Sequence, residues 1–166
     1  SATGNDGLGR ATAAAGTAAV NAVSAGAIVL TGAATSTVTA SAGDSASEVA
    51  SLINGASTAT NIEADARTVA RLHTLANAGT VSFTLTSDTG STTNSATISA
   101  TINSTSDLTE LASAINAETG TTGVQAVLGS AGDSLDIISE SGDDVIIEGF
   151  TNSGTGNISV AARNYD

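Results

Sequence analysis

The sequence predicts an α+β fold of two tandem ββαβ units, with short amphipathic helices on small, mainly antiparallel sheets, followed by a C-terminal β-hairpin. Three observations lead to this prediction. Nearly the same phrase occurs twice, as "SASEVASLIN" at 45–54 and "DLTELASAIN" at 107–116. Two strand-like stretches precede each copy, and a third follows it. A last apolar alternation, over 134–150, is interrupted by the polar turn "ESGDD".

The repeated phrase has the signature of a short capped helix. In the second copy, which predicts a helix over about 106–117, Asp107 can cap the N-terminus and Glu110 can reach back to the cap. One face of this helix is apolar: Leu108, Leu111 and Ile115. The first copy has the S-x-x-E capping box at Ser45 and Glu48. Its apolar stripe consists of Ala46, Val49, Leu52 and Ile53.

The two copies superpose without a gap when 62 is added to each residue number of the first copy. Asn54 then falls on Asn116, and Ala64, beyond the helix, falls on Ala126. Alternating patterns after the helices predict strands within 62–72 and 124–128. The strands expected before the helices are 27–31 and 37–41 in the first copy, and 81–86 and 97–101 in the second.

These elements divide the chain into three parts. Residues 26–76 form the first unit, and residues 77–166 form the second unit with added C-terminal strands, the two being joined near 74–79. The added strands are the hairpin over 134–150 and a last strand over 157–162. Residues 1–25 are an entry segment, either loosely attached or an extra strand.

Burial of the helix stripe explains why the phrase is needed. About four aliphatic side chains, at roughly 1.5–3 kcal/mol each when fully buried, contribute several kcal/mol, comparable with the whole net stability of a small domain. We therefore expect each helix to cover the apolar face of its own small sheet. The carboxylates of the phrase then serve as helix caps rather than as catalysts.

Composition narrows the function. The chain has 166 residues and a net charge of -12, with 16 acidic residues and four basic ones, all arginines: Arg10, Arg67, Arg71 and Arg163. Without basic clusters, nucleic-acid and membrane partners are not expected. The absence of Cys removes disulfides, thiol nucleophiles and Cys-based metal sites. The few aromatic residues, Phe83, Phe150 and Tyr165, disfavour a pocket for a flat cofactor.

Candidate chemical residues are few. His73, the only histidine, has no Ser, Asp or metal partner at motif spacing, so we interpret it as a solvent-facing strand residue without a catalytic role. Six acidic residues near the end of the chain could supply oxygen ligands to calcium: Asp133, Asp136, Glu140, Asp143, Asp144 and Glu148. Their spacing fits neither an EF-hand nor a nonapeptide repeat, which favours turn and strand-surface roles.

Three weaker motifs complete the search. "GNDGLGR" at 4–10 has spaced glycines, but no strand precedes it and no Lys-Ser/Thr follows, so a phosphate loop is not expected. Asn103-Ser104-Thr105 and Asn157-Ile158-Ser159 match the N-glycosylation pattern, which occurs often by chance in a Ser/Asn-rich chain. We predict no catalytic, cofactor-binding or metal-binding residues.

The duplicated stretch resembles the flagellin hook IN motif, found in the exposed outer domains of bacterial flagellins and in related filament-cap proteins. The matching features are the helix ends Ile53-Asn54 and Ile115-Asn116, a Gly/Thr/Asn linker, and strands that open with Ile62-Glu63-Ala64 or Val124-Gln125-Ala126. The resemblance covers about 27–150. It implies the outer portion of a flagellin, without the long terminal helices that polymerise the filament.

From this resemblance we expect a non-enzymatic, structural protein of the extracellular bacterial flagellum, whose partners are other flagellin subunits, with surface glycans implied but no cofactor. An adhesin or filament-cap domain that binds a glycan or host surface through Thr-rich strand faces is the alternative. A glycosidase using paired carboxylates ranks third, because no such pair stands in an apolar cleft.

Overall fold

The computed structural model describes residue 21 and residues 23–163. The strands run β1 Gly26–Thr31, β2 Thr35–Ala40, β3 Thr68–His73, β4 Gly79–Asp88, β5 Thr93–Ile102, β6 Val124–Leu128, β7 Ser134–Ser139, β8 Asp144–Asn152 and β9 Ser159–Ala162. The helices are α1 Ala46–Gly55, α2 Ser57–Thr60, α3 Thr109–Ala117 and α4 Thr119–Thr122. The alternatives for the entry segment fall almost entirely outside the described residues, as do "GNDGLGR", Arg10 and Tyr165.

The strands form three sheets, in the orders β1-β2, β6-β7-β3-β9 and β5-β4-β8. Every pairing between them is antiparallel. Together with the helices, this confirms the predicted α+β class. Strands were also correctly expected in the segments that became β1, β2, β4, β5, β6 and β9.

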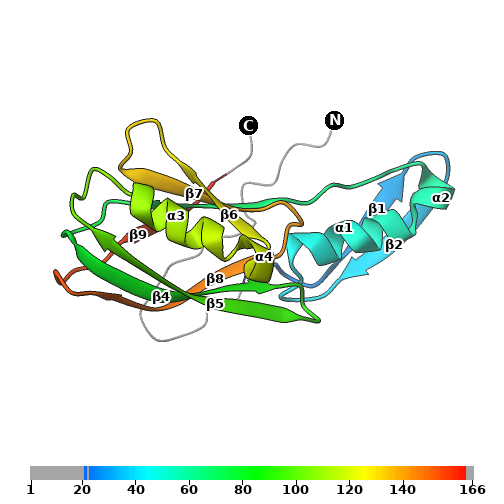
Figure 1. Ribbon diagram of the computed structural model, residues 1–166. Helices are drawn as coiled ribbons and strands as arrows, with labels where there is room; N and C mark the ends of the chain where they lie inside the picture. Colours follow the sequence, from blue (N-terminus) through cyan, green and yellow to red (C-terminus); the bar gives the residue numbers. More distant parts are fainter. Residues whose placement is uncertain (1–20, 22, 164–166) are drawn as a thin grey trace.

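The main core lies between the two larger sheets. Helix α3 sits between the sheet that contains β4 and β5 and the sheet that contains β6 and β7 (Figure 1). Its Leu111 and Ile115 are fully buried in one cluster with aliphatic residues from both sheets: Leu72, Val81, Leu85, Ile98, Leu135 and Ile137. Two layers of sheet therefore enclose this helix, which a single small sheet could not do.

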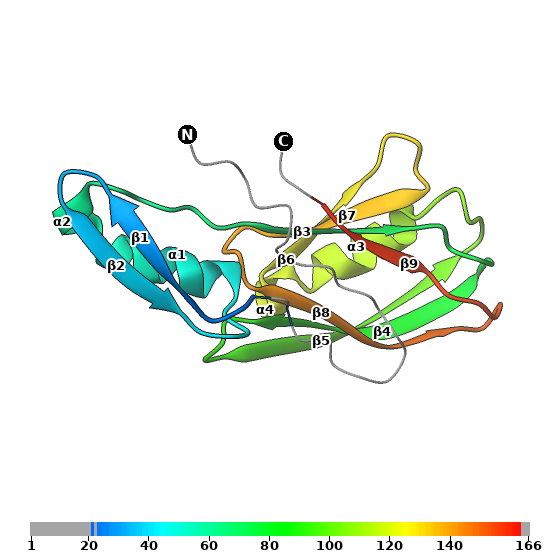
Figure 2. The ribbon, with the colours of Figure 1, turned by 180° about the vertical axis from the view of Figure 1, so that it is seen from behind.

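The first copy forms a smaller body at one end of the molecule. Its β1–β2 hairpin lies against α1, away from the two larger sheets (Figure 2). The buried residues here are few and mostly small: Leu30, Ala40, Ser45, Ala50 and Thr60. Only Ala50 is buried on α1 itself. The helix covers one face of the hairpin, and none of the sheets formed by the described residues covers the other side of the helix.

The third strand of each predicted unit leaves its own hairpin. Strand β3 pairs with β7 and β9 rather than with β1 or β2, and β6 pairs with β7 rather than with β4 or β5. Strand β3 also starts later, at Thr68, than the alternation over 62–72 indicated. The division between residues 76 and 77 follows the sequence repeat, whereas the four-stranded sheet takes strands from both sides of it.

The predicted hairpin over 134–150 is wrong. Both strands exist, but β7 belongs to the four-stranded sheet and β8 to the three-stranded one. The turn between them carries the chain from one layer to the other, with the Asp143 N–H bonded to Ser139 Oγ at 3.2 Å. Leu135 and Ile137, the apolar positions of the alternation on β7, are buried in the core, and Val145 and Ile147 of β8 pack against that core from the other layer.

The two helix caps differ from each other. The capping box of the first copy is confirmed: Ser45 Oγ accepts from the Glu48 N–H, and Glu48 accepts from the Ser45 N–H at 2.8 Å. The box predicted for the second copy is wrong, since α3 begins at Thr109 with Leu108 as its N-cap residue. Leu108 is fully buried and its N–H donates to the Gly132 carbonyl, which draws the chain into the core before the helix starts.

Candidate functional site

The repeat places an asparagine clamp in the same position twice. Asn54 donates to the Ala64 carbonyl at 2.9 Å and accepts from the Ala64 N–H at 2.8 Å. Asn116 makes the same two bonds to Ala126, at 2.9 and 2.8 Å. A single side chain thereby satisfies both backbone groups of one residue in the following segment and fixes that segment against the end of the helix.

A short turn sets the reach of each clamp. Helices α2 and α4 follow the clamp asparagines and end at the left-handed residues Asn61 (φ 56°) and Gly123 (φ 71°). Glycine and asparagine are the residues that adopt this conformation most readily, and they let the chain reverse onto the helix end. The linker of the repeat therefore acts as a helix-ending turn.

Two threonines complete this turn and were not singled out from the sequence. Thr60 Oγ1 donates to the Ala56 carbonyl at 2.9 Å and accepts from the Ile62 N–H at 3.2 Å. Thr122 Oγ1 makes the equivalent bonds to Glu118 and Val124, at 3.0 and 3.2 Å. Their sequence signal is that each occupies the sixth position after the clamp asparagine, directly before the left-handed residue.

The clamp residues have no chemistry of their own. The amides are neutral, each bonded to backbone, and the carboxylate of the phrase in the first copy, Glu48, is engaged in the cap. What this site can do is position a strand relative to a helix. It is a structural device rather than a catalytic centre.

A groove lies beside the first clamp. Its volume is about 370 Å³, and α1 contributes one wall: Ala46, Val49, Ala50 and Ile53. Residues 64–69 supply the opposite wall. In the second copy the residues equivalent to that helix wall, Leu108, Leu111, Ala112 and Ile115, are buried in the core. The two helices thus carry the same stripe in different surroundings.

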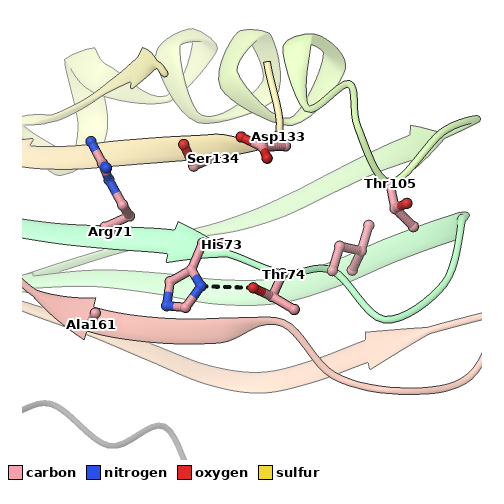
Figure 3. A pocket seen from close by; sticks show the side chains of 8 residues that line it. Arg71, His73, Thr74, Thr105, Asp133, Ser134 and Ala161 are labelled. Carbon is pink, nitrogen blue, oxygen red and sulfur yellow. Dashed lines mark hydrogen bonds between the residues drawn. The ribbon is translucent and has the colours of Figure 1, made fainter. Parts of the chain in front are cut away.

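A second, more polar depression of about 560 Å³ contains the only histidine (Figure 3). His73 is half-buried at the end of β3, where its Nδ1 lies 2.8 Å from Thr74 Oγ1. Arg71 is held by Asp136 on β7 through two 2.7 Å bonds. This differs from a hydrolytic triad, in which a histidine lies between a nucleophile and a carboxylate.

Four of the six acidic residues considered for calcium are engaged by different partners. Asp136 pairs with Arg71 and Glu140 pairs with Arg67, in both cases at 2.7 Å. Asp143 is buried and accepts from Ser87 and Ser141, while Asp144 accepts from Asn21. Within the described part of the chain, no group of three or more His, Cys, Asp or Glu side chains could hold a metal ion.

Two of these carboxyls have shifted acidity in opposite directions. The hydrogen bonds from Arg71 hold the pKa of Asp136 below its ordinary value. Burial raises the pKa of Asp144, and the negative charges of Asp88, Glu48 and Asp143 add to this rise. Asp144 lies where the first copy meets the main body, so ionised carboxylates accumulate at this junction.

The remaining motifs stay predictions. Asn103 and Asn157, of the two glycosylation patterns, are both exposed. None of the described helices is long and apolar enough to span a bilayer.

No protein-family model matches the chain, and no curated protein matches its sequence. The resemblance to the hook IN motif therefore depends on the quoted residues alone.

Proposed function

We propose that this chain is a surface-exposed outer domain of a bacterial flagellar filament protein, a flagellin, with a structural and non-catalytic role. The observation that carries the proposal is the duplicated clamp, in which Ile-Asn ends a helix and the asparagine holds the following segment. The residues that resemble the hook IN motif are thus the residues that make this device in both copies.

In this proposal the chain consists of two tandem ββαβ units. The element order β1-β2-α1-β3 is repeated as β4-β5-α3-β6, with the short helices α2 and α4 in the linkers. The third strands tie the units together, because β3 and β6 both pair with β7. A rod made in this way holds its two repeats in a fixed relation, which suits a domain that projects from a filament.

Composition agrees with secretion to the outside of the cell. A subunit exported unfolded must refold without help, and a chain without Cys or Pro avoids disulfide errors and slow X-Pro isomerisation. Acidic domains repeated along a fibre repel neighbouring fibres and remain hydrated. The partners in this role are other flagellin subunits, with possible glycans on the surface.

Antibody labelling of intact cells tests the proposal. Antibodies raised against this chain, applied to the bacterium that encodes it and viewed by electron microscopy, are expected to label flagella along their whole length. Labelling confined to the filament tip would assign the domain to a cap protein. Labelling of other surface structures, with bare flagella, would contradict a flagellar role. A strain that lacks the gene is the control for specificity.

The alternative is an adhesin or cap domain that binds a glycan or host surface. It is favoured by the outward faces of two strands, which are rich in exposed hydroxyl groups: Thr35, Thr37 and Thr39 on β2, and Thr97, Ser99 and Thr101 on β5. A glycan array probed with the folded domain tests it. Specific binding that is lost when Thr97 and Thr101 are changed to Val would favour the adhesin over the filament protein.

A further inference from the structure

Residues 62–66 connect α2 to β3 and belong to no strand themselves, and one edge of their backbone has no backbone partner among the described residues. Both backbone groups of Ala64 bond to Asn54, and in an extended chain the backbone groups of its neighbours point the opposite way. Among the described residues, the backbone groups of Glu63 and Asp65 have no backbone partner. Those of their counterparts in the second copy, Gln125 and Val127, face the neighbouring strand β7, opposite Ile138 and Asp136.

The groove beside this edge is apolar on its helix side. Val49 and Ile53 of α1 are half-buried, whereas their counterparts Leu111 and Ile115 are fully buried. In the second copy, the strand that pairs with β6 contributes Leu135 and Ile137 to the same buried cluster as α3. The first copy has the helix, the clamp and the free backbone edge, but no described strand stands where β7 stands in the second copy.

Strand β9 shows the direction from which a covering strand can come. It pairs antiparallel with β3, with Ala162 opposite Ala70, and the Arg163 N–H bonds to the Val69 carbonyl at 3.1 Å. Both Ala162 and Arg163 line the groove. A strand that continues this line runs antiparallel along 67–62, on the side to which the backbone of Glu63 and Asp65 points.

We propose that residues 62–66 and the groove beside α1 form a β-augmentation site. Its occupant is an extended peptide strand that lies in line with β9 and antiparallel to 62–66. Backbone hydrogen bonds hold it to Glu63 and Asp65, and aliphatic side chains at alternate positions enter the groove against Val49 and Ile53. The site stands whether or not the chain is a flagellin domain.

Charge restricts the strand further. The charged residues that line the groove are three acids, Asp44, Asp65 and Asp144, and two arginines, Arg67 and Arg163. Acidic groups are thus in slight excess at the groove, and the chain as a whole has a net charge of -12. An uncharged or basic strand therefore fits the site, whereas an acidic one is repelled. A second copy of this acidic chain is for the same reason a poor occupant.

An extended version of the chain tests the site. The extension adds Thr-Val-Thr-Val-Thr-Lys after Asp166. If the register of β9 with β3 continues along the chain, the first new residue falls opposite Asp65 and the fourth opposite Ile62. Both valines then fall on the groove side, like Ala162 and Ala64. Covalent attachment gives an effective concentration on the order of millimolar, so that weak pairing is still measured.

The matched control carries Pro-Val-Pro-Val-Thr-Lys, which has the same length, charge and valines but lacks the two N–H groups that would face Asp65 and Glu63. We expect the amide hydrogens of Glu63 and Asp65 to exchange at least tenfold more slowly in the Thr-Val version than in the Pro version. The methyl signals of Val49 and Ile53 should shift in the same comparison. Gln125 and Val127 report on the integrity of the second copy and should not change.

Three results would overturn the proposal. Equal exchange of Glu63 and Asp65 in the two versions would exclude strand pairing at this edge. Shifted methyl signals without amide protection would mean that the groove accepts apolar groups of any kind, such as a small molecule. Protection that appears only in a dimer, as separated by size-exclusion chromatography, would replace the in-line strand by a second copy of the chain.

Discussion

Helices α1 and α3 have nearly the same sequence phrase but opposite surroundings. In α3, Leu111 and Ile115 are fully buried between two sheets. In α1, the equivalent Val49 and Ile53 are half-buried beside a groove, and Leu52 is 36% exposed. The amphipathic pattern therefore specifies a helix and its apolar face, but the number of layers around that face is decided by distant strands.

The first copy offsets its thin core with local interactions. It has the complete capping box at Ser45 and Glu48, while the second copy has only a bond from the Thr109 N–H to Asp107. The N-terminus of α1 is also bonded to the main body, where the Ser47 N–H donates to the Gly142 carbonyl at 3.0 Å. Stability in the second copy comes from burial, and in the first it depends more on hydrogen bonds at the ends of the helix.

The largest expected difference is between two isoleucines at equivalent positions. Ile115→Ala removes a fully buried side chain and should lower the free energy of unfolding by about 2–5 kcal/mol. Ile53→Ala removes a half-buried one beside the groove and should cost about 1 kcal/mol, because less apolar surface is lost from the folded state. Urea denaturation followed by circular dichroism measures both. Equal losses would contradict the difference in burial.

Removing the clamp asparagine should also cost more stability in the second copy than in the first, but by a smaller difference. Asn116→Ala leaves both backbone groups of the buried Ala126 without their partner and should cost about 2–3 kcal/mol. Asn54→Ala leaves those of Ala64 to water and should cost about 1 kcal/mol. Denaturation of both variants tests this, with the exposed Asn103→Ala as the control. A larger loss for Asn54→Ala would reverse the ranking.

For the helix caps we expect the opposite order: removing the cap should cost more stability in the first copy than in the second. Ser45→Ala removes a buried capping box and should cost about 1 kcal/mol. Asp107→Ala removes a single exposed bond two residues before α3 and should cost less than half of that. Thermal unfolding by calorimetry compares the two variants. If Asp107→Ala proved the more harmful, the second helix would depend on its cap after all, and the contrast between the copies would be lost.

Local features of this fold were predictable, and long-range pairings were not. The capping box at Ser45, the apolar stripes and the alternating strands depend on residues a few positions apart, so the sequence displays them. The partners of β3 and β7 depend on which strands meet across the core, and no local pattern records that choice. Leu108 shows the same limit. Its sequence spacing from Leu111 fits a helix, but Leu108 is buried in the core as the N-cap residue, before the first residue of α3.

The clamp site was predictable in part for the same reason. The Ile-Asn ends and their constant distance to Ala64 and Ala126 are visible in the aligned copies, and the resemblance drew attention to them. The sequence does not point to Thr60 and Thr122, because a threonine in a Thr-rich linker carries little signal. The groove could not be predicted at all, since it results from a covering strand that the second copy has and that is absent from the first among the described residues.

The smallest effect expected concerns charge at the junction of the copies. Because the pKa of Asp144 is raised, the folded state holds a proton that the unfolded state has already lost, so its ionisation lowers stability as pH rises above about 4. Asp144→Asn keeps an acceptor for Asn21 and should make the protein more stable at pH 7, with the gain vanishing below about pH 4.

Asp136→Asn serves as the control, because its expected effect on stability at pH 7 has the opposite sign. Its pKa is lowered by Arg71, so its charge stabilises the fold above about pH 4, and that contribution is lost as pH falls through the folded-state pKa. The variant should therefore be less stable than the parent at pH 7 and approach it in acid. Urea midpoints at several pH values measure both curves. If Asp144→Asn also lost stability at pH 7, the hydrogen bond from Asn21 to the ionised Asp144 would contribute more than burial and charge repulsion cost. The charge of Asp144 would then stabilise the junction, contrary to our expectation.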